Sequence, residues 1–517
     1  MQQISAVERD NVSNGSVTTE PGGGYISELD TALLMFSEQD IWTLRDACEG
    51  VLITGGIGSG KSSGSGAMIF KSYLRAGFGG LVCCANVDEV DRWRGYCQET
   101  GRSQSLIVID KSLRHRFNFL DYQMTVGRGS TFEAVRVLLD ILSAAEGKVE
   151  EASDGKDQFW QQTLKEILGK TLSPLWAAYG RITLSEMIRF ISERPTSPDQ
   201  LKDPDWKAAS FWNQTIKQVA DSPARPFDRA DMQSVMTYWT KTLMFGDART
   251  TGNIVQNLTA KLDPFTSGDL RRLFATTTTV VPEMSFEGAV IVLDLSAHEW
   301  GEEGLLGQHI LKTMWQRAIQ RRPKTPDARP CFLAADECQY FLAKGDQAFQ
   351  STSRACRALT VYLTQNLPGV YAKLSGSSAQ NTADALLGNL ATKIFHAQPD
   401  PRTAQWAAEM IGKSLVWRGN IGETEGGNVG TGTNSSTSGG RGSPGQNSSG
   451  TNTSQGRNWG TSRGASQQID YRLQPSHFGM LLKGGGPERM SEAVIYQAGR
   501  LFNHTGSTWT PALFRQG

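Results

Sequence analysis

A glycine-rich turn between an apolar strand and a helix constrains this chain more than any other feature. Val51-Leu52-Ile53-Thr54 has the unbroken apolar character of a buried parallel strand. It runs directly into Gly55-Gly56-Ile57-Gly58-Ser59-Gly60-Lys61-Ser62, and a helical pattern follows from Ser63 to Arg75. Such a turn directs backbone N–H groups and a helix N-terminus at phosphate oxygens. The spacing therefore predicts a phosphate-binding loop in an α/β domain.

The positions of this loop have predicted roles. Lys61 supplies a positive charge to the β- and γ-phosphates, and the Ser62 hydroxyl completes the coordination shell of Mg²⁺. ATP and Mg²⁺ are the predicted ligands. An accidental match in an ordinary turn is disfavoured, because a strand precedes the loop and a helix follows it. The residues predicted to bind the nucleotide are Gly55, Gly56, Gly58, Ser59, Gly60, Lys61, Ser62 and Ser63.

A pair of carboxylates ends a second apolar strand, Cys331–Ala335. Asp336 is predicted to hold Mg²⁺, usually through water, and Glu337 to orient and deprotonate the attacking water. The alternative is a solvated Asp-Glu pair, which the phosphate loop elsewhere in the chain makes less favourable. Asp294 also ends an apolar strand, but Leu295 follows it in place of a second carboxylate, so Asp294 ranks second.

A third apolar strand, Leu359–Leu363, leads into Thr364 and Gln365. We expect the Gln365 amide to lie near the γ-phosphate and to sense its presence. Arg354 and Arg357 precede this strand, where one arginine can reach the nucleotide of a neighbouring subunit; an arginine supplied in trans contributes roughly 10³–10⁵ in rate. A surface ion pair is the alternative for both arginines, and it is favoured for Arg357.

Charge and hydropathy exclude several classes of protein. The 517 residues include 52 basic and 52 acidic side chains, so any site for a polyanion must be local. No apolar stretch approaches the ~20 residues that cross a bilayer, and the N-terminus lacks a signal-peptide pattern. We therefore expect a cytoplasmic protein, whose contact with the inner membrane, if any, is made through a partner.

Composition and periodicity divide the chain into segments. Helical periodicity broken by prolines predicts an all-helical domain inserted into the α/β domain, and a segment rich in Gly, Ser, Thr and Asn predicts a flexible insertion. Strands are expected at Gly479–Lys483 and Ala493–Gln497. The predicted order is a disordered tail (1–24), the first α/β part (25–125), the helical domain (126–280), the second α/β part (281–421), the flexible insertion (422–466) and the C-terminal α/β part (467–517).

Several motifs, in this order, resemble the type IV coupling ATPases of conjugation and secretion, the TraG/TraD-like branch of the FtsK–HerA superfamily of P-loop ATPases. They are the phosphate loop, Asp336-Glu337-Cys338-Gln339, and Ser353-Arg354 leading to Thr364-Gln365-Asn366. The stretches at 386–395 and 478–486 are also similar to the family. One departure is Asn86, which stands in a segment where members often carry a lysine. The chain is similar to a soluble form of the family, without a membrane anchor.

The resemblance implies a RecA-like motor domain with an all-α domain, assembled as a homo-hexameric ring. Such a ring hydrolyses ATP with Mg²⁺ and passes DNA through its centre without regard to sequence. On this basis Arg354 is the finger supplied in trans and Gln365 is the γ-phosphate sensor. The implied partners are DNA and proteins of the secretion or relaxosome type.

A second hypothesis comes from another class of function. The chain would be a nucleotide-gated recruitment platform, or a defence-system ATPase, whose helical domain binds protein partners without moving DNA. Stimulation of ATP turnover by DNA distinguishes the motor from the platform. A P-loop kinase of small molecules fits poorly, because such enzymes do not use an Asp-Glu strand end.

Overall fold

The computed structural model describes residues 24–145, 155–343, 345–374, 379–438 and 446–516, and a nine-stranded sheet is its central feature. The strand order is β13-β12-β9-β3-β8-β7-β4-β6-β5. The strands from β9 to β5 are parallel, whereas β12 and β13 add an antiparallel margin beside β9. The strands are β3 (Val51–Thr54), β4 (Gly79–Cys83), β5 (Leu106–Ile109), β6 (Val290–Leu293), β7 (Cys331–Ala335), β8 (Ala358–Thr364), β9 (Thr392–His396), β12 (Met490–Gln497) and β13 (Trp509–Arg515).

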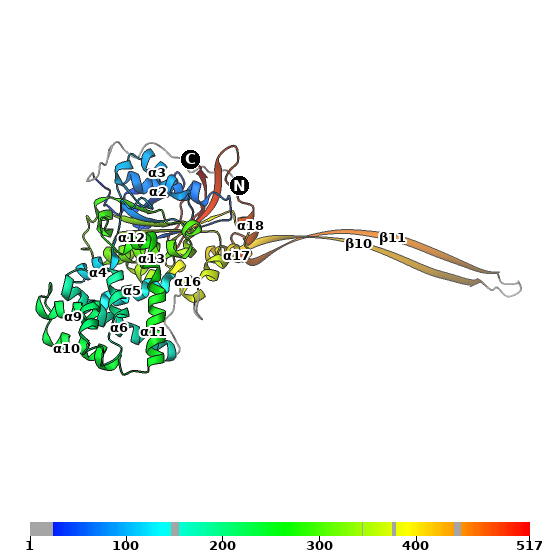
Figure 1. Ribbon diagram of the computed structural model, residues 1–517. Coiled ribbons are helices and arrows are strands. Elements are labelled where there is room, and N and C mark those ends of the chain that lie inside the picture. The colour runs from blue at the N-terminus through cyan, green and yellow to red at the C-terminus, as the bar shows by residue number, and fades with distance from the viewer. Residues whose placement is uncertain (1–23, 146–154, 344, 375–378, 439–445, 517) are drawn as a thin grey trace. The chain divides into compact units, whose positions relative to one another are not determined.

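Helices cover both faces of this sheet. In Figure 1, α2 (Ala67–Arg75) and α3 (Glu89–Glu99) lie on one face, and α13 (Ala297–Arg321) lies on the other. Every residue of β3, β7 and β8 is buried as a result. Parallel strands buried on both sides read as continuous apolar runs, which is why these strands are evident in the sequence.

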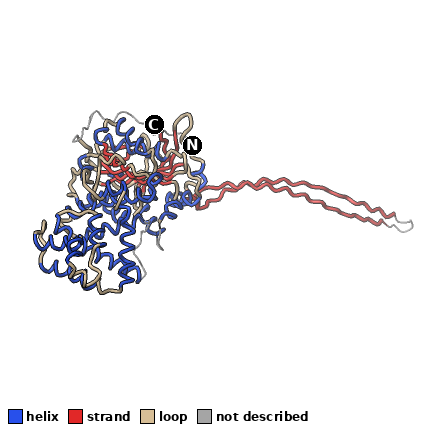
Figure 2. Tube along the Cα trace, viewed as in Figure 1, coloured by secondary structure: helices blue, strands red, loops and turns tan. Residues whose placement is uncertain are grey.

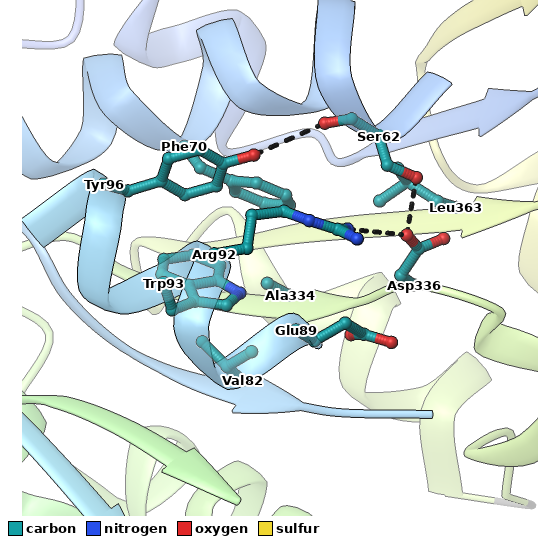
Figure 3. Close-up of a pocket in the computed structure, with 10 residues that line it drawn as sticks. All are labelled: Ser62, Phe70, Val82, Glu89, Arg92, Trp93, Tyr96, Ala334, Asp336 and Leu363. Atoms are coloured by element: carbon teal, nitrogen blue, oxygen red, sulfur yellow. Dashed lines mark hydrogen bonds and ion pairs between the residues drawn. The ribbon is translucent and has the colours of Figure 1, made fainter. Parts of the chain in front are cut away.

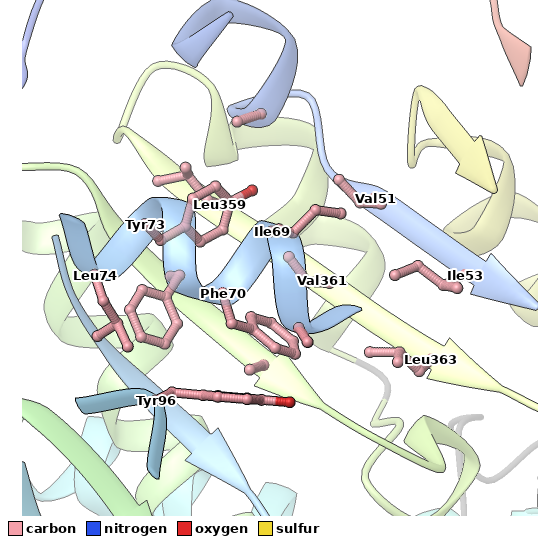
Figure 4. Packing of buried hydrophobic residues seen from close by; sticks show 14 of the residues in the cluster. Val51, Ile53, Ile69, Phe70, Tyr73, Leu74, Tyr96, Leu359, Val361 and Leu363 are labelled. Atoms are coloured by element: carbon pink, nitrogen blue, oxygen red, sulfur yellow. The ribbon is translucent and has the colours of Figure 1, made fainter. Parts of the chain in front are cut away.

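The core next to the phosphate loop is built from β3, β8 and α2. Val51 and Ile53 of β3 belong to one buried cluster with Phe70 and Tyr73 of α2 and Leu363 of β8 (Figure 4). Burying an aliphatic or aromatic side chain contributes about 1.5–3 kcal/mol relative to leaving it exposed. The packing therefore fixes the strand that enters the loop and the helix that leaves it.

A run of helices lies between β5 and β6 in the sequence. It packs against the α/β part through α13, where Arg317 pairs with Glu133 (3.2 Å) and Asp140 (3.0 Å) of α5. Trp212 and Trp239 are buried within it. Its α-helices are α4 (Phe119–Val126), α5 (Thr131–Ala145), α6 (Gly155–Tyr179), α7 (Leu184–Ser192), α8 (Pro204–Ala209), α9 (Phe211–Asp221), α10 (Arg229–Thr237), α11 (Ala248–Leu262) and α12 (Gly268–Phe274).

Residues 405–475 form a compact unit separate from the unit made by residues 1–404 and 476–517. Within it, β10 (Lys413–Ser438) pairs antiparallel with β11 (Gln446–Tyr471) along its whole length (Figure 2). The sequence predicts a flexible insertion at 422–466, and the described part of that segment has a regular strand conformation. In a two-stranded ladder alternate residues pair their backbone groups across the strands and the others turn theirs to water, so low hydrophobicity does not exclude it.

The C-terminal part also corrects one prediction. No strand forms at Gly479–Lys483; the short helix α18 (Pro475–Gly479) ends there instead. Proline is well suited to the first turn of a helix because it lacks an N–H. The predicted tail at 1–24 lies outside the described residues except for Gly24.

The other elements are short and lie around the sheet. None of the helices in the described ranges is both long and apolar enough to cross a bilayer. These remaining elements are β1 (Ala32–Met35), β2 (Ile41–Thr43), α1 (Leu44–Ala47), α14 (Gly345–Ser353), α15 (Leu367–Lys373), α16 (Ala379–Gly388) and α17 (Pro401–Ile411).

Candidate nucleotide-binding site

The phosphate loop joins β3 to a helix that begins at Lys61. Gly58 (φ 71°) and Gly60 (φ 93°) adopt positive φ, a conformation that side chains disfavour. A Cβ at Gly60 would also lie 2.4 Å from Ser491 Oγ. The first turn, Lys61–Gly66, is π-helical, and α2 continues from it. The loop thus has the tight geometry that a phosphate-binding turn requires.

Asp336 directly follows β7, and its carboxylate meets the phosphate loop. The Ser62 hydroxyl donates a hydrogen bond to Asp336 Oδ2 over 2.5 Å (Figure 3). The Glu337 backbone N–H holds the other carboxylate oxygen, Oδ1, at 3.0 Å. A hydroxyl and a carboxylate are oxygen ligands that Mg²⁺ prefers. Ser62 and Asp336 therefore fit the magnesium ion predicted for this site.

Glu337 lies beside Lys61. The Lys61 ammonium is 3.3 Å from Glu337 Oε1, and both side chains are largely buried. Gln365 donates to Oε1 (3.0 Å) and Gln339 donates to Oε2 (2.9 Å). Burial by itself raises the pKa of Glu337, but the charge of Lys61 and the two amide hydrogen bonds outweigh it and lower the pKa below its ordinary value. The carboxylate is ionised and fixed in direction by its neighbours.

The strand order explains how these side chains meet. β8 lies between β3 and β7 in the sheet. Its C-terminal end therefore opens between the phosphate loop and the two acids, and Gln365 leaves the strand at that point. The structure thus brings five of the predicted residues together. They are Lys61, Ser62, Asp336, Glu337 and Gln365.

Glu89 is an additional carboxyl group beside the site, which the sequence did not identify. Its Oε1 accepts from the backbone N–H groups of Ala85 (3.1 Å) and Asn86 (2.8 Å) and from the Asn86 amide (3.1 Å). Burial, followed by the negative charge of Asp336, raises the pKa of Glu89 to about 8. Glu89 follows β4, and parallel strands end at one edge, but its place beside Asp336 depends on β4 lying next to β7, which no pattern in the sequence indicates.

Arg92 also belongs to this part of the site. It lies one turn after Glu89 on α3, and its guanidinium is 3.5 Å from Asp336 Oδ2. Ser62, Glu89, Arg92 and Asp336 line one small pocket together with Tyr96 (Figure 3). Arginine on a half-exposed helix carries no distinguishing sequence signal, so the pattern gave no reason to select it.

Two further contacts hold the helical turn that follows the loop. His396 Nε2, at the end of β9, is hydrogen-bonded to Ser65 Oγ over 2.7 Å. Gln516 Nε2 donates to Ser63 Oγ over 2.5 Å. Ser63, predicted to bind the nucleotide, thus has its oxygen held by a residue more than 450 positions away in the sequence.

The remaining sequence candidates lie away from the phosphate loop. Arg354 pairs with Glu49 over 2.9 Å, and both residues precede strands that lead into the site, so they lie at the opposite edge of the sheet. Arg357 is buried, and its guanidinium donates to the Ser27 carbonyl, which is a structural role. Asp294 ends β6, which β4 separates from β7. Within one chain, the site therefore contains neither arginine nor Asp294.

Comparison with known proteins adds a family match and a set of similar folds. Residues 330–458 match a family model described as the TraM recognition site of TraD and TraG. TrwB, a plasmid coupling protein in complex with the ATP analogue ADPNP, is 13% identical and has a TM-score of 0.54, with 98% of this chain and 93% of TrwB covered. The chain has the fold of TrwB. No curated protein matches it in sequence.

Two further TrwB structures give the same result. An unbound monoclinic form of TrwB is 12% identical with a TM-score of 0.53, covering 94% of this chain and 88% of that one. TrwB in complex with ADP and Mg²⁺ is 13% identical with a TM-score of 0.52, covering 98% and 92%. The predicted α/β class, a RecA-like P-loop domain with an all-α domain, is confirmed. The predicted resemblance to coupling ATPases is confirmed by the TrwB-like fold and by the TraG/TraD match.

Proposed function

We propose that this chain is a Mg²⁺-dependent ATPase that works as a coupling protein and moves DNA during conjugation or type IV secretion. The contact between Ser62 and Asp336 carries the proposal, because it joins the phosphate loop to the acidic strand end at a magnesium-like donor set. The TrwB fold and the TraG/TraD match support the same class of protein. The nucleotide-bound structures of TrwB, with ADPNP and with ADP and Mg²⁺, support ATP and Mg²⁺ as ligands.

The chain's own residues suggest how hydrolysis proceeds. Lys61 would neutralise the β- and γ-phosphates, and Ser62 and Asp336 would hold a magnesium ion, which would supply positive charge to the oxygens of the γ-phosphate and of the departing ADP. Glu337 accepts the proton of the attacking water, and Gln365 fixes the direction of its carboxylate. Since Lys61 is paired with Glu337, binding of a triphosphate divides the Lys61 charge between the phosphates and the base.

We further propose that the protein acts as a homo-hexameric ring, in which Arg354 of one subunit completes the site of the next. The half-exposed position of Arg354 at the sheet edge opposite the phosphate loop supports this arrangement. DNA would be bound without regard to sequence, mainly through phosphate contacts. Such binding is strongly weakened by salt.

Lys61→Ala and Glu337→Gln test the enzymatic part of this proposal. We expect Lys61→Ala to abolish both nucleotide binding and ATP hydrolysis. Glu337→Gln should lower the rate of ATP hydrolysis by roughly 10²-fold or more, whereas nucleotide binding persists, because only the base is lost. Binding is measured by fluorescence of an ATP analogue and hydrolysis by phosphate release, with and without DNA across a salt series. Equal hydrolysis by wild type and both variants would refute an ATPase at this site.

The family match favours one alternative function. The model that matches residues 330–458 is described as a recognition site for a protein, TraM, in TraD and TraG. A nucleotide-gated platform would use this segment, or the helical domain, to recruit a partner without moving DNA. A turnover rate that ignores DNA but responds to a relaxosome-type protein would favour the platform over the motor.

A further inference from the structure

Arg92 lies between two carboxylates. Its Nη2 is 2.7 Å from Asp88 Oδ2, one helical turn earlier on α3, and its Nη1 is 3.5 Å from Asp336 Oδ2. The two partners differ in environment, because the Asp88 side chain is 71% exposed and that of Asp336 only 13%. Arg92 thus has one partner in solvent and one in the site.

The second partner is the oxygen on which the magnesium site depends. Asp336 Oδ2 accepts the Ser62 hydroxyl and also faces Arg92. Figure 3 shows the guanidinium directed at this carboxylate, with Glu89 also lining the pocket. Arg92 is therefore the cation that balances Asp336 from the side of α3.

We propose that Arg92 and magnesium compete for Asp336, with Asp88 as the position to which the guanidinium withdraws. This inference rests on the proposed function, because it requires the magnesium site at Ser62 and Asp336. Two cations at one carboxylate repel each other. Asp88 already holds Nη2, so Arg92 can give up Asp336 by a side-chain movement alone and keep one ion pair. Arg92 then sets the magnesium concentration at which the site binds its nucleotide.

Nucleotide binding as a function of magnesium concentration tests this inference without turnover. Binding of a fluorescent, non-hydrolysable ATP analogue is titrated with MgCl₂ for wild type, Arg92→Gln and Asp88→Asn. For Arg92→Gln we expect a magnesium midpoint lower by roughly 1.5- to fivefold, the range of a partly exposed charge pair, and unchanged affinity at saturating magnesium. For Asp88→Asn we expect a higher midpoint, because Arg92 loses its alternative partner.

Arg94→Gln is the matched control, since Arg94 lies on the same helix and pairs with Asp91 in solvent. It should leave the magnesium midpoint at the wild-type value, and Arg92→Lys should lie between wild type and Arg92→Gln. Thermal unfolding of each variant verifies that it is folded.

Two results would overturn the inference. The first is a loss of nucleotide affinity in Arg92→Gln at every magnesium concentration, which would make Arg92 a phosphate contact. The second is an unchanged midpoint in both Arg92→Gln and Asp88→Asn. If wild type itself binds no nucleotide, or binds it equally without magnesium, the proposed function fails, and that outcome is distinct from both.

Discussion

His396 shows how one buried side chain next to the phosphate loop can make the stability of the protein depend on pH. It is fully buried, and its ring is hydrogen-bonded to Ser65. Ser65 lies about one helical turn after Lys61. Burial, with a smaller contribution from the Lys61 charge, lowers the pKa of His396 to about 3. The folded protein therefore holds this ring neutral at pH values where the unfolded chain protonates it.

This shift predicts a pH-dependent stability that a His396→Gln variant loses. The stabilisation of the neutral ring is complete above pH ~6.5, the unfolded pKa, and is lost as the pH falls towards 3. Between these limits wild type should lose up to about 1.4 kcal/mol per pH unit relative to the variant. Urea unfolding at several values from pH 5 to pH 8 measures this difference. Parallel stability curves for the two proteins would contradict it.

Also at the scale of residues, the sequence identified site residues that stand in motifs and missed those that only the three-dimensional packing brings to the site. Lys61, Ser62, Asp336 and Glu337 stand in fixed patterns beside apolar strands, and the structure brings them together. Glu89 and Arg92 have no such pattern. Their place depends on β4 lying next to β7, and strand order is decided by long-range packing that a sequence does not display. The catalytic roles of the motif residues stay predictions.

At the scale of elements, burial decides which strands the sequence reveals. β3 and β7 were predicted with the observed bounds, since each is an uninterrupted apolar run. β9 was not predicted as a strand, because Lys393 interrupts its apolar pattern. That lysine is buried, with its Nζ 2.5 Å from the Leu390 carbonyl. Burial lowers its pKa to about 8. A polar side chain satisfied by a carbonyl is indistinguishable from a surface residue in the sequence.

The hairpin of β10 and β11 predicts an unusual tolerance of deletion. Its described large side chains Leu415, Val429, Trp459 and Ile469 are 64–74% exposed, so they contribute no buried core. Replacing residues 420–464 with an Asn-Gly turn, which suits a two-residue hairpin, should leave the thermal midpoint within about 2 °C, because little apolar area is lost. Differential scanning calorimetry measures it. A matched substitution in the core, Phe70→Ala, should lower the midpoint clearly. A comparable drop in the deletion variant would show that the hairpin stabilises the rest of the chain.

At the scale of the whole molecule, the proposed ring makes a test by mixing subunits possible. Lys61→Ala and Arg354→Ala should each be inactive, the first through its own loop and the second through the site of its neighbour. Mixed rings contain sites with an intact loop facing an intact Arg354, so mixing should restore part of the ATPase rate. Phosphate release from mixtures of varied ratio measures the recovery.

The control uses two residues of one site. Lys61 and Glu337 lie side by side in the same chain, so mixing Lys61→Ala with Glu337→Gln yields no complete site and should restore nothing. Recovery in this control, or its absence in the Arg354 mixture, would place Arg354 outside the neighbouring site.

β8 connects a residue of the subunit's own site, Gln365, with the residue proposed to act on the neighbouring site, Arg354. It is a buried strand of seven residues, about 23 Å long at the usual rise per residue. Gln365 follows one end and touches Glu337, whereas Arg354 precedes the other end by a few residues. Each residue of β8 is paired with β3, with β7 or with both, so in the proposed function a shift at Gln365 would reach Arg354 along the strand. In the proposed ring, β8 of each subunit would then couple the nucleotide site of that subunit to the site of its neighbour.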